Sequence, residues 1–515
     1  MLPEECLYCY NLVPSEYGLR LRKGYREWAI GLNNPVNTII GFEGQAQDES
    51  SSKLFAITLE GIWNVTTYGT TISGVPDVVF SDNGPTAGYG VFTEMTNDAG
   101  SRILAYADEA NGLFYYYETG LTWLPIPTFT LPAGSTSPFG PPLAADIVYA
   151  VTWKNRLWFI ERDTAYAWYL QPGAIQGEAT PFNFGAKFVH GGEIKAIFNW
   201  TVDGGLGVDD ILVVVSGGGD VLTYKGTDPN SIDTFELIGA YYVGSFPASR
   251  KVGLTYGGEL YLISTFGVIS VRQLMQGILY EDPSLGPSAK INRYLRDAVE
   301  SGRESYDWSM TIYPSDGFLQ IIAPYNLSNN ENAIQYQQNL MTQAWGLWRG
   351  VPIRSAASWK GLYLIGTPDG RVVEYYGSLD NSSTFAGGPI GTSIDYSILT
   401  SYQAPAGNTT SYKKVNFIRP IQVTRFQINA VTRAIYDYEF DAMLPTPNGL
   451  PNSGGDDWDA ATWDASIWSG QQGSESTVDG VLGQGRVIAV AMRGRSSDRL
   501  TFVSWDIDYQ TGGFL

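Results

Sequence analysis

The stretch QYQQNLMTQAWGLWRGVPIRSAASWKGLYLIGTPDGRVVEY, residues 335–375, decides the fold class and sets a pattern that recurs through most of the chain. It contains two strand-turn-strand units in succession, each with a polar or glycine-bearing turn. Residues 362–366 alternate between two faces, which is typical of a half-buried strand. Pro-Asp-Gly at 368–370 then turns the chain into the next strand. The stretch therefore predicts antiparallel hairpins that follow one another.

Six further hairpins precede this one, at intervals of about 40 to 60 residues. They span residues 52–66, 101–117, 146–169, 193–224, 252–271 and 308–323, and several turn at Asn-Gly, Gly-Gly or Asp-Gly pairs. Strand modules repeated at such a period are typical of a β-propeller. We predict an all-β protein with a six- or seven-bladed β-propeller over residues 34–380, preceded by an N-terminal arm and strand over residues 1–33.

One segment of the propeller region has helical periodicity. Ser288 stands where an N-cap would, and Gly302 follows the last periodic residue. The residues that share one face are Ile291, Tyr294, Leu295, Ala298 and Val299. We predict one inserted helix over about residues 288–301, packed across the propeller rim in a structural role.

The C-terminal part, residues 381–515, has a different pattern. Strands are predicted at residues 394–401, 414–423, 427–437, 485–494 and 500–509. Together they indicate a β-sandwich or platform domain. Within it lies a glycine-bounded Trp-Asp loop over residues 454–470, in which Trp458, Trp463 and Trp468 recur every five residues, a spacing that matches neither a helical nor a strand face.

Composition limits the possible functions. Only 16% of the 515 residues are charged, the formal net charge is −20, and Gly (59), Tyr (33) and Trp (15) are abundant. An excess of carboxylates argues against non-specific binding to nucleic-acid phosphates, although DNA could slide past such a surface. The first residues lack a signal-peptide pattern, and no apolar run reaches the length of a membrane helix. We therefore expect no membrane-spanning segment.

The inventory of catalytic groups is small. His190 is the only histidine, and Cys6 and Cys9 have no second ligand pair for a zinc site. Carboxylates that could form a glycosidase pair or a loose calcium site occur in two loops: Asp203, Asp209 and Asp210 in the first, and Asp456, Asp457, Asp459 and Asp464 in the second. Asp clustered with Gly is also typical of solvated loops, and the Asp spacing does not match the EF-hand pattern, so we expect no catalysis, no metal and no cofactor.

Three regions of the chain resemble the tail nozzle (tail tubular protein B-like) proteins of short-tailed bacteriophages. The opening matches at Asn11, Leu12, Pro14, Gly18, Arg20, Arg22, Gly24 and Tyr25, and the late hairpins match at Asn339, Ala344, Trp345, Trp348, Leu362, Tyr363, Gly370 and Val372. The C-terminal part matches at Lys413, Lys414, Arg419, Pro420, Trp458, Asp459, Trp463, Asp464, Trp468, Gly483, Gly485, Ala489, Asp506, Tyr509, Gly512, Gly513 and Leu515. The middle hairpins match only in architecture.

The resemblance implies a structural protein of the virion tail, made in the bacterial host cytoplasm. It implies a homohexameric ring that extends the tail below the adaptor proteins, near tail fibres or spikes. This ring would help to retain the packaged viral DNA and would form its exit channel. As contacts with other subunits or the adaptor we predict Arg20, Arg22, Lys23, Arg26, Trp458, Trp463 and Trp468. The alternative function is a carbohydrate-binding or glycan-cleaving propeller, because abundant aromatic residues suit stacking against sugars.

Overall fold

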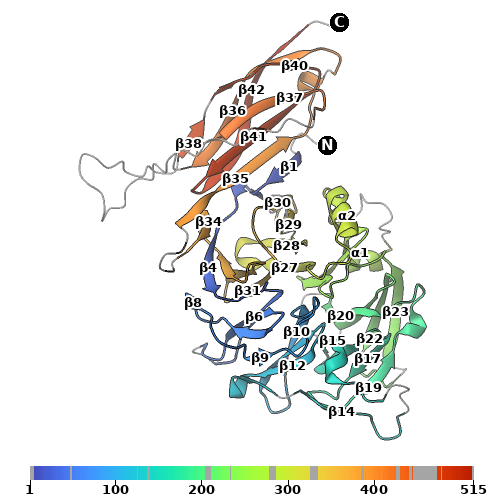
Figure 1. Ribbon diagram of the computed structural model, residues 1–515. Coiled ribbons are helices and arrows are strands. Elements are labelled where there is room, and N and C mark those ends of the chain that lie inside the picture. The colour runs from blue at the N-terminus through green and yellow to red at the C-terminus, as the bar shows by residue number, and fades with distance from the viewer. Residues whose placement is uncertain are drawn as a thin grey trace.

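The structure is a computed structural model of the full chain (Figure 1). It describes residues 5–46, 49–124, 126–135, 140–202, 210–231, 234–277, 286–324, 334–383, 385, 388, 390–407, 409–424, 430–439, 444, 473–476 and 478–512. Strands dominate these residues, and they form a propeller with a second β-domain beside it. The prediction of a β-propeller with a C-terminal β-sandwich is confirmed.

The described residues form seven blades around a common centre, within the predicted range of six or seven (Figure 1). Blade 1 contains β5 (Thr38–Phe42), β6 (Lys53–Thr58), β7 (Gly61–Asn64) and β9 (Val78–Val79); blade 2 contains β10 (Gly90–Thr96), β11 (Arg102–Asp108), β12 (Gly112–Tyr117) and β13 (Thr122–Trp123). Blade 3 contains β15 (Ile147–Trp153), β16 (Arg156–Glu161), β17 (Tyr166–Tyr169) and β19 (Thr180–Asn183); blade 4 contains β20 (Ile194–Thr201), β21 (Asp210–Ser216), β22 (Asp220–Gly226) and β23 (Phe235–Tyr242).

The later blades continue the order. Blade 5 contains β24 (Gly253–Tyr256), β25 (Glu259–Ser264) and β26 (Gly267–Ser270), and blade 6 contains β27 (Ser309–Tyr313), β28 (Phe318–Ile322), β29 (Ile334–Asn339) and β30 (Trp345–Arg349). Blade 7 contains β31 (Ser355–Trp359), β32 (Leu362–Gly366) and β33 (Val372–Tyr375). Small elements outside the blades are β8 (Thr70–Thr71), β14 (Phe129–Thr130), β18 (Gly177–Glu178) and the 3-10 turns Glu118–Gly120, Ala144–Asp146, Gly185–Lys187, Pro314–Asp316 and Pro405–Gly407.

An N-terminal strand closes the ring. β4 (Tyr25–Ile30) pairs antiparallel with β33, so the outer strand of blade 7 comes from the opposite end of the propeller sequence. Ala29 of β4 is fully buried and lies opposite Val372. Trp28 packs edge-on against Trp359 of β31. Because β4 lies within residues 1–33, part of the segment predicted as a separate arm and strand belongs to the propeller.

Apolar side chains between neighbouring blades hold the ring together. One core cluster joins Phe42 and Phe55 of blade 1 to Tyr106 and Tyr116 of blade 2, and another joins blades 3 and 4 around Trp158. Tight Lys154-Asn155 and Gly257-Gly258 turns, all four residues with positive φ, connect strands within blades 3 and 5. Hydrophobic contact between successive sheets is thus the main stabilising interaction of the propeller.

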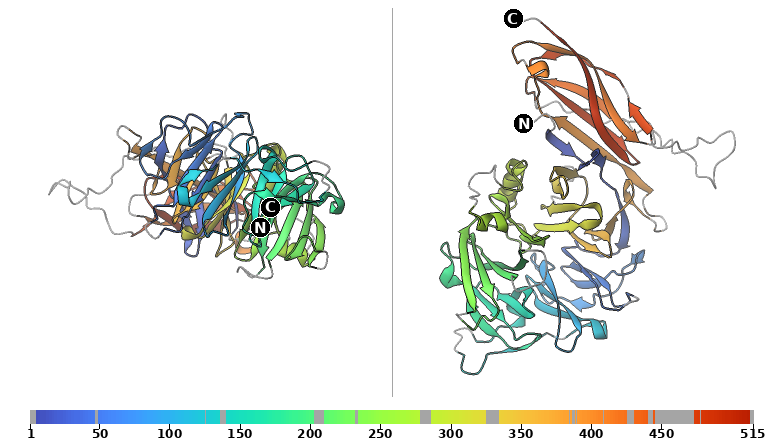
Figure 2. Two further views of the ribbon diagram at one scale, coloured as in Figure 1. Left: turned by 90° about the horizontal axis from the view of Figure 1, so that it is seen from below. Right: turned by 180° about the vertical axis from the view of Figure 1, so that it is seen from behind.

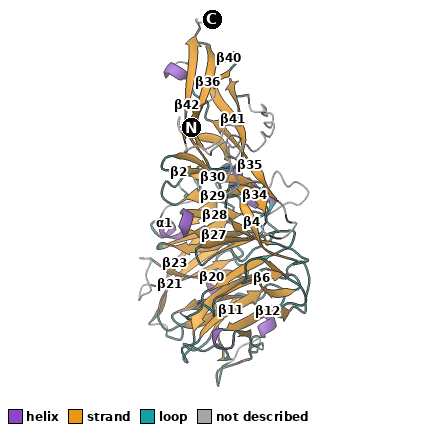
Figure 3. Cartoon of the chain, turned by 90° about the vertical axis from the view of Figure 1, so that its left-hand side faces the viewer, coloured by secondary structure: helices purple, strands orange, loops and turns teal. Residues whose placement is uncertain are grey.

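The second domain packs two sheets face to face. One contains β35 (Ile390–Thr400), β37 (Ala430–Tyr436) and β41 (Ile488–Ser496), and the other contains β36 (Lys413–Thr424), β38 (Gly473–Ser476), β39 (Asp479–Gly480), β40 (Gln484–Gly485) and β42 (Leu500–Thr511). Side chains such as Tyr396, Ile418, Met492 and Phe502 fill the space between them. Figure 3 shows this sandwich above the propeller, with the C-terminus at its far end.

The chain start and a short crossing strand connect the two domains. β1 (Cys6–Tyr10) pairs antiparallel with β35 of the sandwich and meets β30 of blade 6 at Tyr10 and Leu347. β2 (Leu12–Ser15) and β3 (Gly18–Leu21) form a hairpin that pairs with β42. β34 (Leu379–Ser382) pairs with β35 and touches β4. The views from behind and from the side agree that the N-terminal strands lie at this junction (Figures 2 and 3).

The described residues contain two α-helices where the sequence predicted one. α1 (Val271–Met275) follows β26 directly, and α2 (Asn292–Ser301) packs Leu295 and Val299 between blades 5 and 6. The predicted helix start at Ser288 is wrong. The Ser288 hydroxyl accepts a hydrogen bond from the backbone N of Val268 (2.9 Å) and donates to Asn292 (2.5 Å), so it anchors the helix to blade 5 and caps nothing.

Candidate functional site at the propeller–sandwich joint

Asn11 holds the two domains together. It stands between β1 and β2 with φ of 61°, a left-handed conformation that asparagine adopts more readily than most residues. Its Nδ2 donates to the carbonyl oxygens of Arg349 (3.0 Å) and Asp395 (2.7 Å). Its Oδ1 accepts from the backbone N of Arg349 (2.8 Å) and from Nε of Arg22 (2.9 Å). One buried amide thus joins blade 6, sandwich strand β35 and Arg22, the residue that follows β3.

Arg22 corrects a prediction from the sequence. In the sequence, Leu19 and Leu21 alternate with Arg20 and Arg22, and this strand pattern predicts that both arginines point outward. The Arg22 side chain is instead 1% exposed. Both terminal nitrogens bond the two carboxylate oxygens of Asp380 at 2.6 Å. Because β3 ends at Leu21, the alternation no longer applies, and Asp380 neutralises the charge that burial would otherwise make unfavourable. Burial lowers the pKa of Arg22, but Asp380, with smaller contributions from Tyr375 and Tyr25, raises it overall, so Arg22 stays charged inside the joint.

The other three basic residues lie in different surroundings. Lys23 pairs with Asp316 (2.7 Å). Arg26 pairs with Glu374 (2.7 Å), and its guanidinium carbon lies 3.8 Å from the centre of the Tyr376 ring. Arg20 is exposed on β3. The predicted basic cluster is therefore divided: Arg22 is buried, Lys23 and Arg26 are partly exposed, and Arg20 is exposed. A contact between these residues and a neighbouring subunit stays a prediction.

The predicted aromatic contacts and most of the acidic candidates lie outside the described residues. These are Trp458, Trp463, Trp468, Asp203, Asp209, Asp456, Asp457, Asp459 and Asp464. Asp210 is described: it is buried at the start of β21, where it accepts a hydrogen bond from Thr201 Oγ1 (2.6 Å) and lies 3.6 Å from Lys154 Nζ. These local contacts give Asp210 a structural role in blade 4.

The cysteines and the histidine have structural surroundings. Burial, with a smaller contribution from Glu5, raises the pKa of the Cys6 thiol to about 11, and burial raises that of Cys9 as well. Both therefore stay protonated thiols near neutral pH, a form that reacts slowly and binds metals poorly. The Nδ1 atom of His190 lies 2.7 Å from the Asp220 carboxylate, and its ring packs at a tilt against the Tyr242 ring, which holds the segment before β20 in place.

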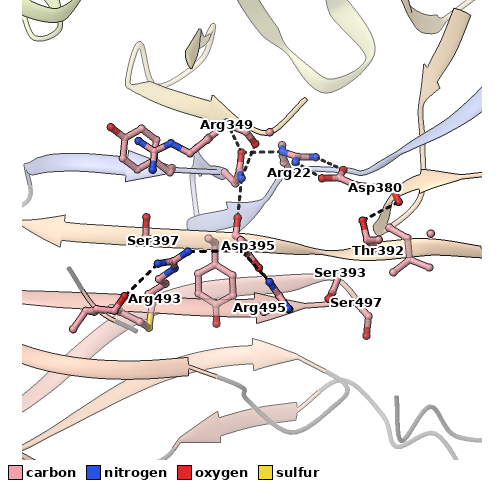
Figure 4. A pocket seen from close by; sticks show the side chains of 18 of the residues that line it. Arg22, Arg349, Asp380, Thr392, Ser393, Asp395, Ser397, Arg493, Arg495 and Ser497 are labelled. Atoms are coloured by element: carbon pink, nitrogen blue, oxygen red, sulfur yellow. Dashed lines mark hydrogen bonds and ion pairs between the residues drawn. The ribbon is translucent and has the colours of Figure 1, made fainter. Parts of the chain in front are cut away.

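A pocket of about 850 Å³ opens beside the joint. Its walls come from β1, the end of β30, β34, β35 and β41 (Figure 4). Four arginines line it, namely Arg22, Arg349, Arg493 and Arg495, against two aspartates, Asp380 and Asp395. Sequence reasoning missed Arg349, Arg493 and Arg495. The alternation of residues 491–495 could have indicated two of them, because Met492 lies in the core whereas Arg493 and Arg495 lie on the opposite face of the strand.

The central tunnel of the propeller encloses about 460 Å³ and is lined by the first strand of every blade. Polar side chains span one mouth of it. Tyr89 of blade 2 donates to Asp307 beside blade 6 at 2.5 Å, and Arg354 beside blade 7 bonds Asn37 (2.8 Å) and Tyr89. Lys251 beside blade 5 donates to Thr38 of blade 1 (2.7 Å). The bonds of Tyr89 with Asp307 and Arg354, and of Lys251 with Thr38, join blades that are not neighbours in the ring, whereas the bond of Arg354 with Asn37 joins the neighbouring blades 7 and 1.

Buried cations near this mouth have shifted pKa values. Burial lowers the pKa of Lys195 to about 8, and the nearby Arg250 adds to the effect. Burial likewise lowers the pKa of Lys251 to about 8, although Asp307 and Asp108 oppose the change. Arg250 is held by Glu109 in a two-point ion pair, with Nε to Oε2 at 2.6 Å and Nη2 to Oε1 at 3.2 Å. The network therefore contains lysines whose charge depends on pH in the alkaline range.

The described residues offer few other candidate sites. Within the described parts of the chain, no group of three or more His, Cys, Asp or Glu side chains is placed to hold a metal ion. No described helix has the length and apolar character needed to cross a membrane. Among the described tryptophans, Trp123, Trp345 and Trp505 are partly exposed and the others are buried.

Comparison with known proteins gives structural neighbours and no relatives. No family model matches the sequence, and no curated protein matches it. Among solved structures, the chain is similar to the computationally designed Ika8 protein (10% identity, TM-score 0.36, covering 68% of this chain and 99% of that one). It is also similar to the Myceliophteria thermophila Cps50 (Swd1) β-propeller domain (12%, 0.37, 70% and 100%) and to YCF48 bound to D1 peptide (10%, 0.38, 68% and 94%).

Proposed function

We propose that this chain is the tail nozzle protein of a short-tailed bacteriophage. In this proposal it is a structural virion protein that assembles into a homohexameric ring below the tail adaptor, near tail fibres or spikes. The ring helps to retain the packaged genome and forms its exit channel during ejection. The protein is made in the bacterial host cytoplasm and resides in the virion tail.

Support comes from where the residues of the family resemblance lie. Asn11, Pro14 and Arg22 belong to the matching opening, and Asn339 belongs to the matching late hairpin. Asn339 Nδ2 donates to the Pro14 carbonyl oxygen across 325 sequence positions (3.0 Å), while Asn11 bonds the end of the same hairpin at Arg349. Matching residues from distant parts of the chain thus build one joint, as expected if the resemblance reflects a shared architecture and not isolated composition.

The size of the central tunnel bears on the route of DNA in this proposal. At about 460 Å³ it is too small to hold a DNA duplex, so the proposed route does not pass through the propeller of one subunit. The exit channel would instead run between subunits, along the axis of the ring. With a net charge of −20, carboxylates on the channel wall would repel phosphates and let the DNA slide.

Loss of the protein from virus particles tests this function. We would place a stop codon in the gene of the phage that encodes the chain, and produce particles in a host that does not suppress it. The expected particles package DNA but leak it, so that nuclease degrades the genome, and they lack the distal part of the tail. Particles from a suppressing host are the control. Nuclease-resistant genomes and normal tails without the chain would contradict the proposal.

A further inference from the structure

The pocket at the joint is built on the outer face of one sandwich sheet. Asp395 and Ser397 of β35 and Arg493 and Arg495 of β41 alternate with the core residues of the same strands, so their side chains share the face turned away from the sandwich interior. The end of blade 6 covers this face and contributes Arg349 (Figure 4). The pocket is therefore enclosed by both domains.

The cations of this pocket exceed its anions. Asp380 is occupied by Arg22 through both carboxylate oxygens. Asp395 binds Arg495 at 2.5 Å and lies 3.9 Å from Arg493. Since four arginines face two aspartates, two positive charges have no carboxylate of their own among the lining residues. Such an excess is unusual in a chain whose formal net charge is −20.

Arg349 is the cation without a carboxylate. Within the described residues no carboxylate lies within ion-pair distance of its guanidinium, and its Nε is shielded from solvent without a hydrogen-bond partner. The guanidinium carbon lies 4.0 Å from the centre of the Tyr10 ring, which holds the side chain in place. Arg349 and Arg493 both lie near Tyr8, where their charges oppose the rise in its pKa that burial causes. The guanidinium groups of Arg349 and Arg493 thus both lie at the end of the pocket that Tyr8 lines.

We propose that this pocket is a binding site for an oxyanion, a carboxylate or a phosphate group, held by Arg349 and Arg493. Planar guanidinium groups bind both kinds of anion through paired hydrogen bonds. The lining hydroxyl groups, such as that of Ser397, supply further donors. The volume of about 850 Å³ is that of a typical ligand pocket. The ligand is either a free anion or an acidic side chain of a partner, and the site does not depend on the proposed role in a phage tail.

Calorimetric titration of the full chain tests the site. The probes are inorganic phosphate and a peptide of glutamates, each at an ionic strength kept constant with chloride, because screening alone changes weak ionic binding. We expect saturable binding of at least one probe with one site per chain. Arg349→Gln should weaken it about tenfold, the loss expected for one charge-assisted contact. Binding of phosphate alone would identify a free anion as the ligand, and preferred binding of the peptide would identify a partner's acidic segment.

Two further variants complete the test. Arg433→Gln removes an exposed arginine of β37 outside the pocket and should leave the affinity unchanged. Arg493→Gln removes the second arginine proposed to bind the anion and should also weaken binding about tenfold. This variant keeps the test decisive if Arg349→Gln disturbs the joint. Absence of saturable binding of both probes would overturn the proposal. Equal affinities of the wild type, both pocket variants and Arg433→Gln would overturn it too.

Discussion

At the residue scale, the joint depends on Asn11, whose amide makes four hydrogen bonds to three separate segments. An amide donates through nitrogen and accepts through oxygen, and Asn11 uses both atoms twice. A carboxylate in its place would offer no donors to the carbonyl oxygens of Arg349 and Asp395. The positive φ of Asn11 adds a second reason, because β-branched residues are strained there.

Asn11→Ala should loosen the joint. The variant leaves several buried polar groups without partners, each costing about 1 to 3 kcal/mol, so we expect the free energy of unfolding to fall by about 3 kcal/mol. Differential scanning calorimetry should show a lower melting temperature and a propeller transition that separates from that of the sandwich. Gln510→Ala, at an exposed position of β42, is the control. An unchanged thermogram for Asn11→Ala would show that these bonds do not hold the domains together.

A second prediction at this scale concerns pH. Lys195 has an ordinary pKa of 10.5 but one of about 8 in the folded protein. Between these values the unfolded state binds more protons, so raising the pH favours the folded state through this residue. Denaturant midpoints measured from pH 8 to 10 should therefore rise less, or fall more, in Lys195→Met than in the wild type. Cys6, whose pKa is raised from 9.0 to about 11, favours the unfolded state as the pH rises. The informative quantity is therefore the difference between the wild-type and Lys195→Met curves.

The matched control for that experiment is Lys414→Met, which replaces an exposed lysine of β36. It should follow the wild-type curve. If Lys195→Met also followed the wild-type curve, the buried amino group would not be the source of the alkaline dependence.

At this scale, the sequence pattern predicted side-chain exposure correctly for a residue within a strand and wrongly for a residue just beyond its end. Arg20 lies on β3 and is exposed, as the alternation indicates. Arg22 lies beyond the end of that strand, and its partner Asp380 is 358 positions away. Periodicity contains no information about such a distant partner. Arg349 was missed for the same reason, because the pocket that it lines is formed by segments far apart in the sequence.

At the element scale, β4 closes the ring by joining the first part of the chain to blade 7. Without it, β33 would expose unpaired backbone groups along an open edge. Ala29→Asp places a carboxylate at a fully buried position opposite Val372, and we expect it to cost about 3 kcal/mol or more. Hydrogen exchange should become faster in β31, β32 and β33 than in blades 3 and 4.

The control is Thr71→Asp on the neighbouring strand β8, where the side chain is exposed. It should leave exchange in blade 7 unchanged. Equal protection of blade 7 in Ala29→Asp and in the wild type would show that β4 is not what keeps the ring closed.

The strands were largely predictable because their signals are local. All seven predicted hairpins occur, each in a different blade, and the five predicted sandwich strands correspond to β35, β36, β37, β41 and β42. The pairing of β1, β2 and β3 with the sandwich could not be predicted, since register between distant segments is set by packing. The short α1 also escaped notice, because five residues are too few to establish a helical period.

At the scale of the whole molecule, ring formation requires that each subunit present two different surfaces to its neighbours. The Trp-Asp loop, residues 454–470, is our predicted contact, because large aromatic side chains often dominate interfaces. The double variant Trp463→Ala, Trp468→Ala should fold with wild-type circular dichroism but assemble poorly in light scattering. Trp123→Ala, a partly buried propeller position, is the comparison. Normal rings from the double variant would remove the loop from the interface.

The oligomeric state of the purified chain is the most direct test of the central claim, the tail nozzle function. It should be measured by light scattering and negative-stain imaging, with and without adaptor rings of a short-tailed phage. The account predicts a closed homohexameric ring, formed by the protein alone or on the adaptor. A stable monomer that ignores adaptor rings at every concentration tested would contradict it.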